Sequence, residues 1–149
     1  MRDIFVDFEM NPINTKFCAA KKRCWGEIIE IGAVMLDENL EKIDSFKCYV
    51  KPEYNEEIFE KYRVLTGIST NMVAGADTFE TAYKSFMQWC GKDYELYAWS
   101  DNDKGQIRKE MELKYFVYEE VEFMFGRCKT CWKRLICMLA GGNLCHRKY

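Results

Sequence analysis

The sequence predicts an α/β domain in which helices pack on a mixed β-sheet. Three segments with the character of strands lie in the first 52 residues and are joined by polar links. Two segments with helical periodicity follow, and then come a short fourth strand and a third helix. The order β-β-β-α-α-β-α indicates an antiparallel meander that a parallel strand extends and that helices flank.

Each predicted strand has its own signature. Residues 2–8 are mostly apolar, and residues 27–37 (EIIEIGAVMLD) are rich in apolar and β-branched side chains. Residues 43–52 alternate in polarity until Pro52 ends them. The fourth strand is predicted in the short segment ELYAW.

The predicted helices follow from apolar residues spaced three and four apart. This spacing occurs in residues 55–65 and again in residues 79–90, where Thr78 is a suitable N-cap and Gly91 a suitable C-cap. A third helix is predicted over residues 103–114.

Length and composition indicate a single globular domain. The chain has 149 residues, of which 48% are hydrophobic and 31% charged, and it contains no apolar run near the ~20 residues that span a bilayer. The N-terminus carries acids inside its apolar stretch and is no signal peptide. We therefore expect a cytoplasmic protein that makes no membrane contact, with its eight cysteines mostly reduced.

Charge is unevenly distributed along the chain. Residues 121–149 contain six basic residues and one acid, which gives this segment a charge of +5, whereas the whole chain has a net charge of −2. The segment also holds four of the eight cysteines. We therefore expect a domain over residues 1–120 and an atypical, Cys-rich basic segment over residues 121–149.

Two acids end the first predicted strand. In IFVDFEMNP, Asp7 and Glu9 are two residues apart, so their side chains lie on one face. Two carboxylates this close repel each other, and a metal ion or a basic side chain between them would relieve the repulsion.

A second acidic pair follows the fourth strand. Asp101 and Asp103 begin a predicted helix, where acids are favoured by the helix dipole, so an N-cap role is one interpretation. The other is that one of them joins Asp7 and Glu9 around Mg²⁺ or Mn²⁺ in a site for phosphodiester hydrolysis. An aspartate-nucleophile phosphatase is less well matched, because its D-x-D pattern is D-x-E here.

Four motifs occur in an order that resembles the DEDD superfamily of 3′-to-5′ exonucleases. They are IFVDFEMNP, EIIEIGAVMLD, LTGIST with the following MVAGADTF, and YAWSDND. The resemblance covers roughly residues 2–115 and is strongest to the DEDDh branch. It implies an RNase-H-like fold, two divalent metal ions (Mg²⁺ or Mn²⁺) and hydrolysis at the 3′ end of single-stranded DNA or RNA.

The resemblance also implies roles for individual residues. Asp7 and Glu9 match the ligands of the first motif, and Asp103 matches the second-motif acid because it stands four residues after Trp99. Asp101 is the alternative to Asp103.

A second group of residues is implied to contact the substrate. The candidates are Phe8, Met10, Leu65, Thr66 and Ile68. For the last three, ordinary packing at a helix end is the alternative interpretation.

The third family motif, H-x-x-x-x-D, supplies a general base and a fourth acid. The single histidine, His146, is the candidate base, with an exposed tail position as the alternative, and no acid stands five residues beyond it. We therefore expect a truncated or frame-shifted ending and a weakly active or inactive nuclease. The competing functions are a non-catalytic module that binds 3′ ends and an inactive truncated product, and the oligomeric state is left open, with a homodimer as one alternative.

Two further features allow alternative interpretations. CKTC with Cys137, Cys145 and His146 resembles a zinc site, although the spacing fits poorly and reduced thiols are the simpler interpretation. Residues 13–26 predict a polar loop whose KKRCW segment is either solvated or in contact with phosphates, with Trp25 stacked on a base.

Overall fold

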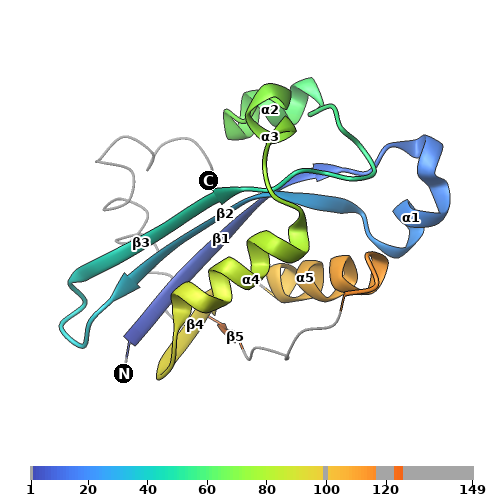
Figure 1. Ribbon diagram of the computed structural model, residues 1–149. Helices are drawn as coiled ribbons and strands as arrows, with labels where there is room; N and C mark the ends of the chain where they lie inside the picture. The colour runs from blue at the N-terminus through green and yellow to red at the C-terminus, as the bar shows by residue number, and fades with distance from the viewer. Residues whose placement is uncertain (1, 99–100, 117–122, 126–149) are drawn as a thin grey trace.

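The computed structural model describes residues 2–98, 101–116 and 123–125, and these residues build one mixed sheet with helices on it (Figure 1). The strand order is β3-β2-β1-β4-β5. The strands are β1 (Arg2–Pro12), β2 (Gly26–Leu36), β3 (Lys42–Tyr49), β4 (Tyr94–Ala98) and β5 (Phe123–Phe125).

The sheet confirms the predicted topology. β1, β2 and β3 form an antiparallel meander, and β4 pairs with β1 in parallel, so β1 is the central strand. β5 was not predicted, and it pairs with β4 in parallel. One irregularity interrupts the ladder, because the register shifts between Glu9 and Met10 of β1.

Helices connect the strands, and the two longest of them cover one face of the sheet. They are the 3₁₀ turn η1 (Thr15–Phe17), α1 (Cys18–Arg23), α2 (Glu60–Thr66), α3 (Thr70–Ala74), α4 (Phe79–Cys90) and α5 (Asp101–Leu113). In Figure 1, α4 and α5 lie along the sheet, whereas α1 and the pair α2–α3 lie near one end of it. No helix among the described residues is long and apolar enough to traverse a bilayer.

The main core lies between the sheet and α4. Alternate residues of β1 meet large side chains of α4, and all of them are nearly inaccessible to solvent: Ile4, Val6 and Phe8 from β1, and Phe79, Tyr83 and Phe86 from α4. The opposite face carries a smaller apolar cluster in which Phe5 stacks on Tyr97 with ring centroids 4.9 Å apart.

The predicted α4 is confirmed with both of its ends, whereas two other predictions were wrong and one helix was missed. Thr78 accepts a hydrogen bond from the Thr81 backbone N–H, and Gly91 follows the last turn. The predicted loop over residues 13–26 contains η1 and α1. α2 begins at Glu60 rather than at residue 55, and α3 was not predicted.

Candidate active site

Asp7 and Glu9 lie on the face of β1 that turns away from α4 and α5. Their neighbours Val6 and Phe8 are buried in the main core on the helix side, so the odd-numbered positions face the other way. Asp7 is exposed and Glu9 is partly buried. The structure therefore confirms that the two carboxylates share one open face.

The neighbouring strand leaves space beside Asp7. Gly32 of β2 stands opposite Asp7 in the register, and Lys47 of β3 stands opposite Gly32. A Cβ built on Gly32 would meet no atom closer than the Asp7 carbonyl oxygen at 3.9 Å. Among the described residues, the sheet surface beside Asp7 therefore leaves space for a ligand.

A third acid and a base on this face were missed by the sequence analysis. Glu30 stands directly opposite Glu9, and its carboxylate lies 3.0 Å from the Lys47 ammonium. The hydrogen bond to Glu30 raises the pKa of Lys47, which also lies 5.4 Å from the centre of the Tyr49 ring. Lys47 is thus a basic side chain on the carboxylate face that pairs with Glu30 of the neighbouring strand. The signal available in the sequence was the charged position within EIIEIG, but pairing it with Lys47 requires the sheet register.

Asp103 approaches the same end of the sheet from another element. β4 ends at Ala98, which pairs with Val6, the residue before Asp7, and α5 begins at Asp101. Asp103 is only 7% exposed. The parallel pairing of β1 and β4 therefore directs the start of α5 toward the end of β1 that carries the acids.

The described residues contain no group of three or more Asp, Glu, His or Cys side chains placed to bind a metal. The convergence of Asp7, Glu9 and Asp103 on an ion stays a prediction. The chemistry of the donors fits it, because carboxylate oxygens are the ligands that Mg²⁺ and Mn²⁺ prefer. The Asp101 side chain, Trp99, His146 and the CKTC segment lie outside the described residues.

A buried ion network fixes α5 to the sheet. Glu110 of α5 is fully buried and accepts hydrogen bonds from the Ile28 backbone N–H at 2.9 Å and from the Gln106 side chain at 3.1 Å. Lys114 lies 2.8 Å from Glu110 and 3.1 Å from the buried Glu27 of β2. This network holds the helix that carries Asp103.

The same network shifts the pKa values of its members. Burial raises the pKa of Glu110, although Lys114 opposes the shift. Burial alone would lower the pKa of Lys114, but Glu110 and Glu27 outweigh it and raise that pKa. Lys114 is therefore a permanent cation at neutral pH, and it compensates the buried carboxylates.

The implied substrate contacts separate into exposed and buried residues. Leu65, at the end of α2, is 54% exposed. Thr66 donates a hydrogen bond to the Tyr62 carbonyl and accepts one from the Ile68 backbone N–H, so it shapes the helix end. Ile68 is 2% exposed and packs with Ile29, which is the packing role considered as its alternative.

Phe8 and Met10 do not present their side chains to the carboxylate face. Phe8 is 4% exposed within the main core, and Met10 packs against the same cluster. The alternation along β1 that exposes Asp7 turns Phe8 toward the helices. The geometry therefore does not support a substrate contact through the Phe8 side chain.

The sheet order and the paired acids on the central strand define an RNase-H-like exonuclease fold. A family model for exonucleases of the RNase T type matches residues 4–124, and the chain belongs to this exonuclease family. The nuclease domain of 3′hExo, a DEDDh family member solved with rAMP, superposes with a TM-score of 0.68 at 24% identity. That match covers 94% of this chain and 70% of the other, and it supports the fold.

Two relatives match over shorter segments. The PolC-type DNA polymerase III of Clostridium perfringens is 38% identical over 85 residues, which are 57% of this chain and 6% of the polymerase. Human 3′-5′ exoribonuclease 1 is 41% identical over 64 residues, which are 42% of this chain and 18% of that protein. The matched segments thus span less than a fifth of either relative.

Proposed function

We propose that this domain removes nucleotides from the 3′ end of single-stranded nucleic acid with the help of two divalent metal ions. The observation that carries the proposal is the pair Asp7 and Glu9 on an open face of the central strand, beside the space over Gly32. Membership of the exonuclease family and similarity to a 3′-5′ exoribonuclease support the reaction and its direction.

Asp7, Glu9 and Asp103 would hold Mg²⁺ or Mn²⁺. When bound, the ions would supply an activated water and stabilise the leaving oxygen of the phosphodiester. The protein's part is to present carboxylates from a rigid strand and from a helix that the buried Lys114 network fixes. Leu65, exposed at the end of α2, is the proposed contact to the terminal nucleotide, and His146 is the proposed general base.

The first test is an oligonucleotide assay. A 5′-labelled single-stranded 12-mer, as RNA and as DNA, is incubated with the protein and Mn²⁺. We expect a ladder that shortens slowly from the 3′ end, because the family's third motif is not matched in this sequence. An Asp7→Asn variant should abolish the ladder, whereas Asp3→Asn should retain it, because Asp3 shares the strand and face but lies beside Glu95 at the far end. Internal cleavage, or an equal ladder from Asp7→Asn, would contradict the proposal. Binding without cleavage would make the domain a 3′-end binding module.

The second test measures metal binding without substrate. A metal that binds the native state stabilises it, by about 2.7 kcal/mol at a concentration 100 times the dissociation constant. We expect Mn²⁺ to raise the melting temperature of the wild type and of Asp3→Asn, but not of Asp7→Asn. A full shift in Asp7→Asn would exclude the proposed ligand.

A further inference from the structure

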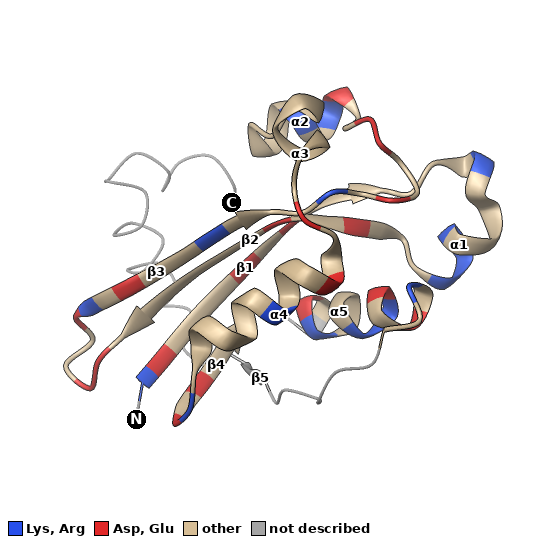
Figure 2. Ribbon diagram, in the orientation of Figure 1, with Lys and Arg blue, Asp and Glu red and all other residues tan. Residues whose placement is uncertain are grey.

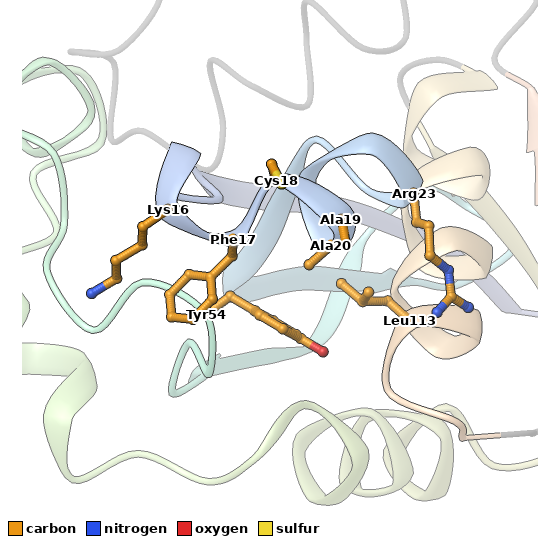
Figure 3. A pocket seen from close by; sticks show the side chains of 8 residues that line it. All are labelled: Lys16, Phe17, Cys18, Ala19, Ala20, Arg23, Tyr54 and Leu113. Atoms are coloured by element: carbon orange, nitrogen blue, oxygen red, sulfur yellow. The ribbon is translucent and has the colours of Figure 1, made fainter.

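A small hollow lies between η1–α1, the loop at Tyr54 and the end of α5. It has a volume of about 340 Å³, and its main lining residues are Lys16, Phe17, Ala20, Arg23, Tyr54 and Leu113. Figure 3 shows Phe17 and Tyr54 close together, with Leu113 facing them and the two basic side chains toward opposite ends. The Phe17 and Tyr54 rings meet edge to face, with centroids 5.7 Å apart.

The walls of the hollow suit one flat, aromatic group. Aromatic faces and edges bind a nucleobase without regard to its sequence, and such stacking contributes about 1–3 kcal/mol per base. Phe17 is 37% exposed, and the Lys16 ammonium lies 5.0 Å from the centre of its ring, so a base that stacks there must share the ring with this side chain. Ala20 and Leu113 are buried together beneath it and give the hollow an apolar floor.

Lys16 and Arg23 line the hollow, and two further lysines lie on α1. Residues 15–25 contain Lys16, Lys21, Lys22 and Arg23 and no acid, in a chain whose net charge is −2 (Figure 2). None of these four side chains forms an ion pair with another described residue. Arg23 donates to the Glu112 backbone carbonyl at 2.9 Å, a bond that fixes the guanidinium without neutralising it. The charge therefore remains available to a polyanion.

The hollow lies along the chain from the paired acids. β1 carries both acids and ends at Pro12, and η1 begins at Thr15. The acids face away from α5, whose residue Leu113 lines the hollow. Only a substrate several nucleotides long could therefore contact both the acids and the hollow, with the hollow holding a nucleotide upstream of the scissile bond.

We propose that this hollow is an upstream nucleotide subsite for single-stranded nucleic acid. One base enters between Phe17, Tyr54 and Leu113, and the adjoining phosphates lie against Lys16 and the basic residues of α1. The proposal rests on the function proposed above. Such a subsite raises the affinity of the domain for substrates longer than a few nucleotides. Trp25, considered above for base stacking, does not line the hollow and packs against Tyr62 with ring centroids 5.9 Å apart.

The test compares a long and a short oligonucleotide. In an Asp7→Asn background, which should not cleave, the affinity for a fluorescent single-stranded 12-mer and for a trinucleotide is measured by anisotropy. We expect Phe17→Ala to weaken binding of the 12-mer about 5- to 150-fold and to leave the trinucleotide unchanged. Lys16→Ala should reduce the slope of log affinity against log salt by about 0.7. Lys42→Ala, an exposed lysine on the edge strand β3, is the matched control and should change neither quantity.

The outcomes separate this inference from the proposed function. Equal losses for both oligonucleotides, no loss for the 12-mer, or no binding of the 12-mer to the parent protein would overturn the subsite. A 12-mer that binds through Phe17 to a wild type that never shortens it would support the subsite and reject the catalytic proposal. In an active enzyme, Phe17→Ala should raise the KM for the 12-mer while kcat stays constant.

Discussion

Replacing Lys114 with Met should destabilise the domain strongly. The lysine ammonium lies 2.8 Å from Glu110 and 3.1 Å from Glu27, and both of these acids are fully buried. Loss of the cation leaves two buried carboxylates without their counter-charge, and removing one partner of such a group costs about 3–5 kcal/mol. The whole free energy of unfolding of a domain is about 5–15 kcal/mol, so the variant should lose a large share of it.

Urea denaturation followed by fluorescence gives the difference in the free energy of unfolding by linear extrapolation. The matching fall in melting temperature is roughly 6–20 °C, at about 2–4 °C per kcal/mol. The difference should narrow as the pH falls, because burial raises the pKa of Glu110 and the folded variant takes up a proton there before the unfolded chain does. Lys84→Met is the control: its ion pair with Glu80 joins side chains 53% and 52% exposed and should contribute only about 0.3–0.5 kcal/mol. A Lys114→Met variant within about 1 kcal/mol of this control would refute the reasoning.

Two further predictions follow from packing and burial. Gly26→Ala should destabilise the domain by about 1–3 kcal/mol, because its Cβ would lie 2.9 Å from the Asn11 carbonyl oxygen. Gly105→Ala in α5 meets no atom within 4 Å and should stabilise the domain by about 0.5–1 kcal/mol. Denaturant melts of the two variants should therefore show changes in the free energy of unfolding with opposite signs. Burial raises the thiol pKa of Cys48 to about 11 and of Cys90 to about 12, from 9.0. Stability due to these thiols is therefore full below pH 9.0 and falls as the pH rises, because the unfolded chain loses its thiol protons first. Melting temperatures under reducing conditions that rose between pH 8 and 10.5 would contradict this sign.

Strong periodicity made parts of the fold predictable from sequence. The apolar spacing of α4, with Thr78 before it and Gly91 after it, specifies the helix and both of its ends locally. By contrast, α1 has only six residues, CAAKKR, which favour helix by propensity but show no amphipathic pattern. The basic run therefore resembled a solvated loop.

The late start of α2 has a cause that lies far away in the sequence. The Asn11 side chain accepts a hydrogen bond from the Phe59 backbone N–H and donates one to the Glu57 carbonyl. Glu27 accepts bonds from the backbone N–H groups of residues 53–55. These buried side chains hold residues 53–59 out of helical geometry, and no local pattern reports partners more than 25 residues distant.

The candidate site, like the fold, could be predicted from the sequence only in part. The shared face of Asp7 and Glu9 was predictable because strand side chains alternate with a period of two. The opposition of Glu9 and Glu30, and the placement of Lys47 beside them, depend on register across three strands, which the sequence does not specify.

The irregularity in the β1–β2 ladder has a consequence for how this domain tolerates change. Glu9 pairs with Glu30 but Met10 pairs with Ile28, so Ile29 is an extra residue that leaves the main core and packs beneath α2 and α3. A bulge of this kind absorbs a one-residue offset that would otherwise turn every following side chain to the wrong face.

The bulge therefore separates two parts of the β1–β2 ladder, which have different registers. On one side of it, the row of Asp7 and Gly32 keeps a fixed register, while on the other side the chain passes into η1 and α1. Insertions or deletions between β1 and β2 would lie on the opposite side of the bulge from Asp7 and Gly32. An insertion or deletion in η1 or α1 should therefore leave Asp7 and Glu9 in the same register with β2.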